Sequence, residues 1–132
     1  MAKILIIDDD QDMVQAMKVV LENKNYQVES ATSGREGLEK AKQHKPDLII
    51  LDVMMENLDT GFEVSRDLKK DPLLKDTPIL MLTSIKERTG FDFEKEAGEP
   101  DWLPVDDYCD KPLNPEDLVA KVEALLRKRG AR

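Results

Sequence analysis

Acidic side chains follow two aliphatic segments of this sequence. Asp8 and Asp9 come directly after residues 3–7, and Asp52 comes directly after residues 48–51. Carboxylates about 4 Å apart repel by roughly 4 kcal/mol at an effective dielectric constant of about 20, so a cluster of them favours a bound cation. Mg²⁺ suits such a cluster, because it is commonly held by one or two carboxylates together with water and phosphate.

A hydroxyl group and an ammonium group end two further segments. Thr83 follows residues 79–82, and Lys111 follows residues 108–110. With a metal ion bound nearby, the carboxylate of Asp52 is suited to attack a phosphorus atom and form an acyl phosphate. Lys111 and Thr83 would then contact the oxygens of the transferred group. The chemistry predicted is therefore phosphoryl transfer to Asp52.

Five segments are expected to be β-strands that position these groups. Aliphatic runs at 3–7, 48–52 and 78–82 indicate strands buried on both faces, as in a parallel sheet. Residues 26–31 alternate more and suit an edge strand, and residues 108–109 form a short fifth strand. Parallel sheets bind ligands beyond the carboxyl ends of their strands, so the reactive side chains are expected to share one site.

Helical segments are expected between these strands. Apolar spacing predicts a helix over 12–23 with Asp10 as its N-cap, and the capping-box pair Ser33 and Glu36 begins another. Asn114 is expected to cap a last helix. Glycine and proline interrupt residues 86–105, which are the least regular part of the chain. The alternation predicts a doubly wound parallel α/β fold.

Length and charge restrict the class of protein. The 132 residues fit a single domain, expected to span 1–132 without an output domain. The net charge of -8 disfavours direct binding to nucleic acid or an anionic membrane, and no aliphatic run approaches a membrane span. The single cysteine, Cys109, excludes an internal disulfide and favours a reducing, cytoplasmic setting.

Four motifs carry a resemblance to a known family. They are Ile7-Asp8-Asp9, Leu51-Asp52-Val53-Met54-Met55, Leu82-Thr83-Ser84 and Tyr108-Cys109-Asp110-Lys111-Pro112. In this order, and over nearly the whole chain, they strongly resemble the receiver domain of two-component response regulators, including single-domain chemotaxis regulators. The resemblance implies a flavodoxin-like, five-stranded parallel sheet of order 2-1-3-4-5.

The resemblance also implies a signalling function rather than an enzyme acting on other substrates. Asp52 is similar in position to the phosphoacceptor, which receives a phosphoryl group from the phosphohistidine of a sensor histidine kinase or a phosphotransfer protein. Asp8, Asp9, Asp52 and the backbone carbonyl of Met54 are similar in position to the Mg²⁺ ligands. Phosphorylation in this family switches a protein-interaction surface, and the expected state is a monomer or a phosphorylation-dependent dimer.

Further roles follow from the same resemblance. Thr83 is placed like the switch hydroxyl, Lys111 like the lysine that contacts the phosphoryl group, and Tyr108 like the aromatic residue that changes rotamer on activation. The residues two positions beyond the aspartate and the threonine, Met54 and Ile85, are apolar. Slow autodephosphorylation is expected, because such positions influence the access of water to the acyl phosphate.

The sequence departs from the family pattern in two places. Glu56 stands where receivers commonly carry proline. Thr83 and Lys111 are separated by more residues than is usual, and the excess lies where a fourth helix is expected, so an irregular or extended region is predicted there. Its aromatic residues Phe91, Phe93 and Trp102 either anchor a long loop to the core or form a partner surface.

Other interpretations lead to different functions. The spacing of Asp8, Asp10 and Asp12 resembles the start of a calcium loop, but Met13 occupies the glycine position, which excludes that loop. One alternative function is a phosphorylation-independent interaction module that works through residues 84–107. A second alternative is a receiver fragment of a hybrid histidine kinase or of a longer regulator. A third is a small Mg²⁺-dependent phosphohydrolase.

Overall fold

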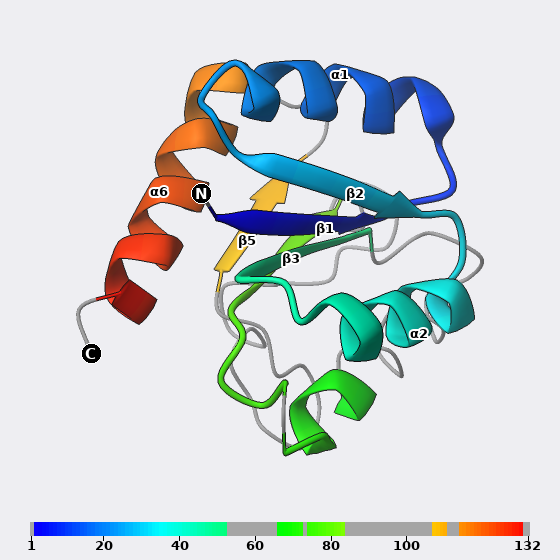
Figure 1. Ribbon diagram of the computed structural model, residues 1–132. Helices are drawn as coiled ribbons and strands as arrows, with labels where there is room; N and C mark the ends of the chain where they lie inside the picture. Colours follow the sequence, from blue (N-terminus) through cyan, green and yellow to red (C-terminus); the bar gives the residue numbers. More distant parts are fainter. Residues whose placement is uncertain (1, 53–65, 73, 84–106, 111–113, 131–132) are drawn as a thin grey trace.

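Parallel strands form one sheet, in the order β2-β1-β3-β4-β5 (Figure 1). They are β1 (Lys3–Ile7), β2 (Gln27–Ala31), β3 (Leu48–Asp52), β4 (Ile79–Thr83) and β5 (Asp107–Asp110). The computed structural model describes residues 2–52, 66–72, 74–83, 107–110 and 114–130. The predicted parallel α/β class is confirmed, and the strand predicted at 26–31 lies at one edge of the sheet.

Helices cover both faces of this sheet. α1 (Gln11–Glu22) and α6 (Pro115–Gly130) lie over one face, and α2 (Gly34–His44) lies over the other (Figure 1). Every residue of β3 is buried, as expected for a central strand covered on both sides. Residues 66–70 are also helical. The predicted irregular region after β4 lies outside the described residues.

The hydrophobic core on the α1 and α6 side follows the alternation of side chains along the strands. Even-numbered aliphatic residues of β1, β3 and β4 pack there against both helices, for example Ile6, Ile50 and Leu82. Met17 of α1 and Val122 of α6 are 1% and 0% exposed in the same cluster. The apolar spacing that predicted α1 therefore marks the face that this helix buries.

Side-chain caps begin α1, α2 and α6. Asp10 Oδ1 accepts a hydrogen bond from Met13 N at 3.1 Å, and Ser33 Oγ accepts one from Glu36 N at 3.1 Å. Asn114 Oδ1 accepts from the backbone nitrogens of the first turn of α6. The predicted caps are confirmed, and each satisfies N–H groups that a helix start leaves without an intrahelical acceptor.

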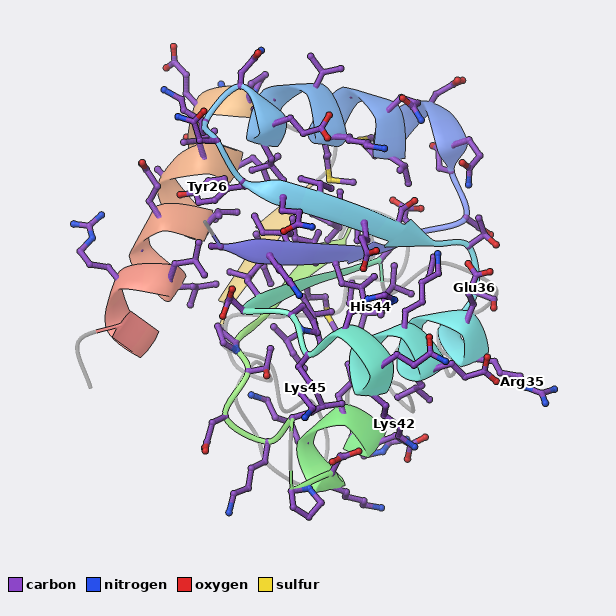
Figure 2. The ribbon with its side chains drawn as sticks, in the orientation of Figure 1. Tyr26, Arg35, Glu36, Lys42, His44 and Lys45 are labelled. Carbon is purple, nitrogen blue, oxygen red and sulfur yellow. The ribbon has the colours of Figure 1, made fainter. Side chains whose placement is uncertain are left out.

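Tyr26 lies where α1 leads into β2, close to α6 (Figure 2). Its partly buried side chain packs against the core cluster. Burial raises the pKa of the Tyr26 phenol, and Glu123 of α6 raises it further, whereas Arg127 lowers it. Desolvation by burial is the largest contribution to the raised pKa, because it disfavours the charged phenolate.

Candidate functional site

The neighbouring strands β1 and β3 bring acidic residues to one edge of the sheet. In the parallel register Ile7 pairs with Leu51. The residues that follow them, Asp8 and Asp52, therefore lie side by side at the carboxyl ends of the strands. Asp8 N donates to Ala31 O at 3.0 Å, so the backbone at Asp8 is also held by β2.

Three carboxylates cluster at this edge. One oxygen from each of Asp8, Asp9 and Asp52 lies within 4.8 Å of the corresponding oxygens of the other two. Asp8 is 0% exposed and Asp52 is 3% exposed, whereas Asp9 is exposed. Burying carboxylates next to one another is costly unless positive charge and hydrogen bonds compensate. The structure thus brings together the three acidic residues that the sequence selected.

The turn from β1 into α1 orients the first two of these acids. Asp8 Oδ1 accepts a hydrogen bond from Asp10 N at 2.9 Å, and Asp10 in turn caps α1 through Met13 N. Aspartate side chains commonly bond the backbone two residues further on, which stabilises such a turn. Asp9 is held between these two bonded residues, with its side chain exposed. The sequence predicted the cap, but not the bond within the turn.

The cluster fits a hard divalent cation by the chemistry of its donors. Carboxylate oxygen is the ligand that Mg²⁺ and Ca²⁺ prefer, whereas zinc sites usually contain histidine or cysteine. Two buried ligands and one exposed ligand leave a solvent-facing side where water or phosphate oxygens can complete the coordination of Mg²⁺. Asp8, Asp9 and Asp52 are therefore suited to hold this ion.

The same carboxyl edge of the sheet continues across β4 and β5. Asp52 of β3 pairs with Leu82 of β4, so Thr83 ends β4 one residue beyond that pair. Thr83 in turn pairs with Asp110 of β5. The backbone at Thr83 and the last residue of β5, which precedes Lys111, therefore lie at the carboxyl edge that carries the acids.

Part of the predicted site lies outside the described residues. This applies to Met54 and Lys111, and for Thr83 and Tyr108 the structure describes the backbone only. The predicted roles of these four residues stay predictions. The acids from β1 and β3 are the described core of the site.

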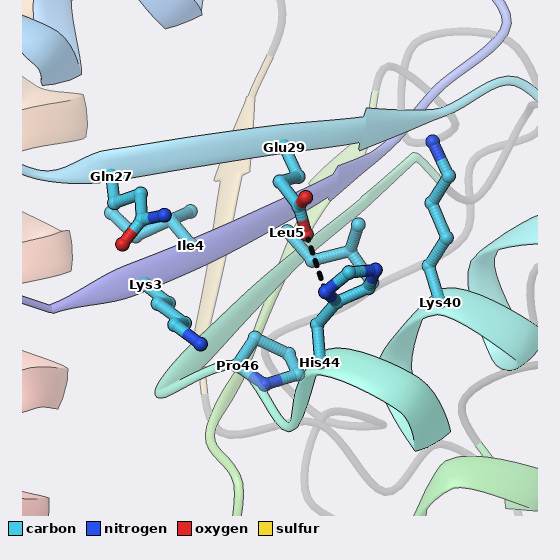
Figure 3. A pocket seen from close by; sticks show the side chains of 8 residues that line it. All are labelled: Lys3, Ile4, Leu5, Gln27, Glu29, Lys40, His44 and Pro46. Carbon is cyan, nitrogen blue, oxygen red and sulfur yellow. Dashed lines mark ion pairs between the residues drawn. The ribbon is translucent and has the colours of Figure 1, made fainter.

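A small hollow lies on the α2 side of the sheet, towards the amino-terminal ends of β1 and β2 (Figure 3). Its lining residues are Lys3, Ile4, Leu5, Gln27, Glu29, Lys40, His44 and Pro46. Its volume of about 30 Å³ holds a few water molecules at most, since one water needs about 10–15 Å³. It is far below the roughly 300 Å³ of a typical ligand pocket.

An ion pair at this hollow was not anticipated from the sequence. His44 is the last residue of α2. Its Nδ1 lies 3.5 Å from Glu29 Oε2, and both side chains are 43% exposed (Figure 3). The two residues belong to α2 and β2, so no local spacing pattern signals the contact.

Comparison with known proteins identifies the family. The model of the response regulator receiver domain matches residues 4–123, and the chain belongs to this family. It is 43% identical over 126 residues to the alkaline phosphatase synthesis transcriptional regulatory protein PhoP of Bacillus subtilis. The aligned region covers 96% of this chain and 49% of PhoP. It is 36% identical to the response regulator ArlR of Staphylococcus saprophyticus, over 98% of this chain and 54% of ArlR. The chain thus spans about half the length of these relatives.

Solved structures show the same fold. The chemotaxis protein CheY4 of Vibrio cholerae superimposes with a TM-score of 0.81 at 35% identity, covering 95% of this chain and 98% of CheY4. A two-component response regulator from Clostridium difficile gives a TM-score of 0.79 at 32% identity, covering 96% and 97% of the two chains.

No helix among the described residues is both long and apolar enough to span a membrane.

Proposed function

We propose that this chain is a phosphoryl-accepting receiver, in which Asp52 takes a phosphoryl group from the phosphohistidine of a sensor histidine kinase or a phosphotransfer protein. The observation that carries the proposal is the convergence of Asp8, Asp9 and Asp52, with carboxylate oxygens within 4.8 Å of one another at the carboxyl edge of the sheet. Family membership supports it, because response regulators partner with sensor histidine kinases in two-component systems.

The transfer is a displacement at phosphorus. A carboxylate oxygen of Asp52 forms the new P–O bond, and the P–N bond to the donor histidine breaks, with its electron pair returning to the imidazole. The product is an acyl phosphate on Asp52. Lys111 and the Thr83 hydroxyl are proposed to contact the oxygens of the transferred group, where negative charge must be stabilised.

Mg²⁺ is the proposed cofactor, held by Asp8, Asp9, Asp52 and the backbone carbonyl of Met54. When bound, it supplies the positive charge that lets a dianionic phosphoryl group approach three carboxylates. Asp8 and Asp52 are buried and Asp9 is exposed. This division supports a site with fixed protein ligands on one side and access for a phosphodonor on the other.

Phosphorylation is proposed to switch a protein-interaction surface through Thr83 and Tyr108. A covalent change can shift such an equilibrium only by interacting differently with the two conformations. The proposed setting is cytoplasmic, without a direct role for nucleic acid or membrane. The chain spans about half of PhoP and ArlR. We therefore propose that residues 1–132 act either as a stand-alone receiver or as the receiver part of a longer protein.

The deciding experiment is intact-mass spectrometry after incubation with Mg²⁺ and acetyl phosphate. We expect one Mg²⁺-dependent adduct of about 80 Da, the mass of a phosphoryl group, and none in Asp52→Asn. Asp76→Asn, an exposed acid far along the chain from the cluster, is the matched control and should be phosphorylated like the wild type.

Three outcomes would contradict the proposal. A failure of the folded wild type to form the adduct, with both acetyl phosphate and a phosphohistidine donor, would favour the interaction module. Multiple turnovers on phosphate esters would favour the phosphohydrolase. Loading in the wild type and in Asp52→Asn alike would show that another residue accepts the phosphoryl group.

A further inference from the structure

β2 lies at the edge of the sheet, and among the described strands only β1 pairs with it. Gln27 N donates to Ala2 O at 2.9 Å, and Asp8 N donates to Ala31 O at 3.0 Å, so Gln27 and Ala31 direct their backbone groups towards β1. Alternate residues of a strand direct these groups in opposite directions. Val28 and Ser30 therefore direct their N–H and C=O groups away from the sheet.

A lysine from α2 occupies one of these outward carbonyls. Lys40 Nζ donates to Ser30 O at 2.6 Å, and the Lys40 side chain extends from α2 towards the carboxyl end of β2 (Figure 3). Lys40 and Ser30 are both partly buried, so the bond is sheltered from solvent. A strand edge is a template for pairing with another chain, and lysines are among the residues that block such edges in natural proteins.

We propose that Lys40 protects the β2 edge, and that removing its ammonium group allows β2 to pair in antiparallel fashion with β2 of a second copy. A two-fold pairing centred on Ser30 would let the two Ser30 residues exchange both backbone hydrogen bonds. The acceptor needed is Ser30 O, which Lys40 now occupies. In the intact protein, two Lys40 ammonium groups would also meet at this axis and repel.

A second copy is the occupant that the residues of β2 favour. In the Ser30-centred register, Glu29 lies opposite Ala31 of the other copy, so no carboxylates face each other across the pair. The contact is self-complementary, because each Ser30 supplies one donor and one acceptor. The inference does not depend on phosphorylation of Asp52, since it concerns the opposite side of β2 from β1 and the acidic cluster.

The test compares the solution mass of lysine variants by analytical ultracentrifugation over a range of protein concentration. Lys40→Met keeps an apolar stem but removes the charge and the donors. We expect its mass to rise from the monomer value of 15.0 kDa towards twice that value. Lys42 is an exposed lysine of the same helix (Figure 2). Lys42→Met, and Lys40→Arg, which keeps charge and donors, should both stay monomeric.

A second substitution locates the interface. Ser30→Pro removes an N–H that points away from β1, so it leaves the β1–β2 ladder intact while blocking strand addition. Combined with Lys40→Met, it should restore the monomer. Circular dichroism establishes that each variant is folded, and Lys40→Gln serves if Lys40→Met is not.

Two results would overturn the proposal. One is a folded Lys40→Met, or a folded Lys40→Gln in its place, that remains monomeric at every concentration. The other is a dimer of the lysine variant that persists when Ser30→Pro is added, since the contact would then lie elsewhere on the molecule.

Discussion

At the scale of single residues, the candidate site consists of three carboxylates that the fold holds close together. Two of its three carboxylates are almost fully buried, at 0% and 3% exposure for Asp8 and Asp52. Water cannot screen charges in such positions as it does at the surface. The backbone bond from Asp10 N to Asp8 Oδ1 holds one of these carboxylates in position. Ion binding at this edge is therefore expected to couple to the stability of the fold.

This coupling leads to a prediction about Mg²⁺. An ion that binds only the folded state stabilises it by about 2.7 kcal/mol at a concentration one hundred times its Kd. We expect Mg²⁺ to raise the thermal unfolding temperature of the wild type. Asp9→Asn should weaken Mg²⁺ affinity about tenfold or more, or roughly 1.4 kcal/mol. Calorimetric unfolding at several Mg²⁺ concentrations measures both effects.

The control for this prediction is Asp76→Asn, which removes the same charge from an exposed turn. It should keep the wild-type response to Mg²⁺. An equal response of Asp9→Asn and the wild type would show that Asp9 is not a ligand.

A second residue, Tyr26, makes a prediction about pH. Its pKa in the folded protein lies above the ordinary value of 10.0, chiefly because of burial. The folded state therefore favours the neutral phenol. The stability that this preference contributes is complete below pH 10.0 and is lost as the pH rises through the raised pKa.

Tyrosinate absorbance measures this pKa. The chain has two tyrosines, so Tyr108→Phe leaves Tyr26 as the only phenol. We expect its titration midpoint in the folded protein to lie above 10.0 and to fall to the ordinary value in denaturant. A midpoint at or below 10.0 in the folded protein would contradict the burial argument.

At the scale of elements, the close approach of α2 to β1 is set by one glycine. A Cβ atom added at Gly37 would lie 2.5 Å from Ile7 Cδ1 and 2.7 Å from Ile7 Cγ1. Ile7 is fully buried and directly precedes Asp8. The absence of a side chain at Gly37 thus lets α2 pack against the strand that carries two of the acids.

We therefore predict that Gly37→Ala is destabilising, although alanine favours helices by about 1 kcal/mol over glycine. Overpacking a well-filled core typically costs about 1–3 kcal/mol, and the crowded atoms belong to the fully buried side chain of Ile7. Urea unfolding measures the free energy. Adding Ile7→Val, which removes Cδ1, should recover part of the loss. Gly37→Ala at least as stable as the wild type would show that the helix shifts easily.

At the scale of the whole molecule, one parallel sheet brings distant segments to a common edge. β1, β3, β4 and β5 are separated in sequence, yet their registers align the chain at Asp8, Asp52, Thr83 and Asp110. Each of these strands brings the residue at its end, or directly after it, to the same edge, which is the usual ligand site of open α/β sheets. The function proposed here therefore belongs to the assembled sheet rather than to any single motif.

The lifetime of the phosphorylated protein is a property of that assembled site. Met54 and Ile85 are apolar and are proposed to limit the approach of water to the acyl phosphate. We expect the mass adduct to persist for minutes or longer at neutral pH. Met54→Asn should shorten this lifetime, whereas Met55→Asn serves as the neighbouring control. Decay of the wild-type adduct within seconds would refute the expectation.

The sequence by itself determined the class of fold and the acidic residues of the site. Aliphatic runs such as residues 48–51 are typical of strands buried on both faces of a sheet, and an acid that follows such a run is then expected at the strand end. The helix caps at Asp10, Ser33 and Asn114 were equally legible, because capping depends on neighbours within a few residues. These features are local or periodic.

Only the tertiary structure decided which side chains meet between elements. The contact of Gly37 with Ile7, the bond from Lys40 to Ser30 O and the pair of His44 with Glu29 all join α2 to the sheet. Each depends on the angle and depth at which the helix packs, which no spacing along the chain encodes. The acids of the site were predictable because parallel strands align their own ends, whereas the protection of the β2 edge depends on how α2 docks.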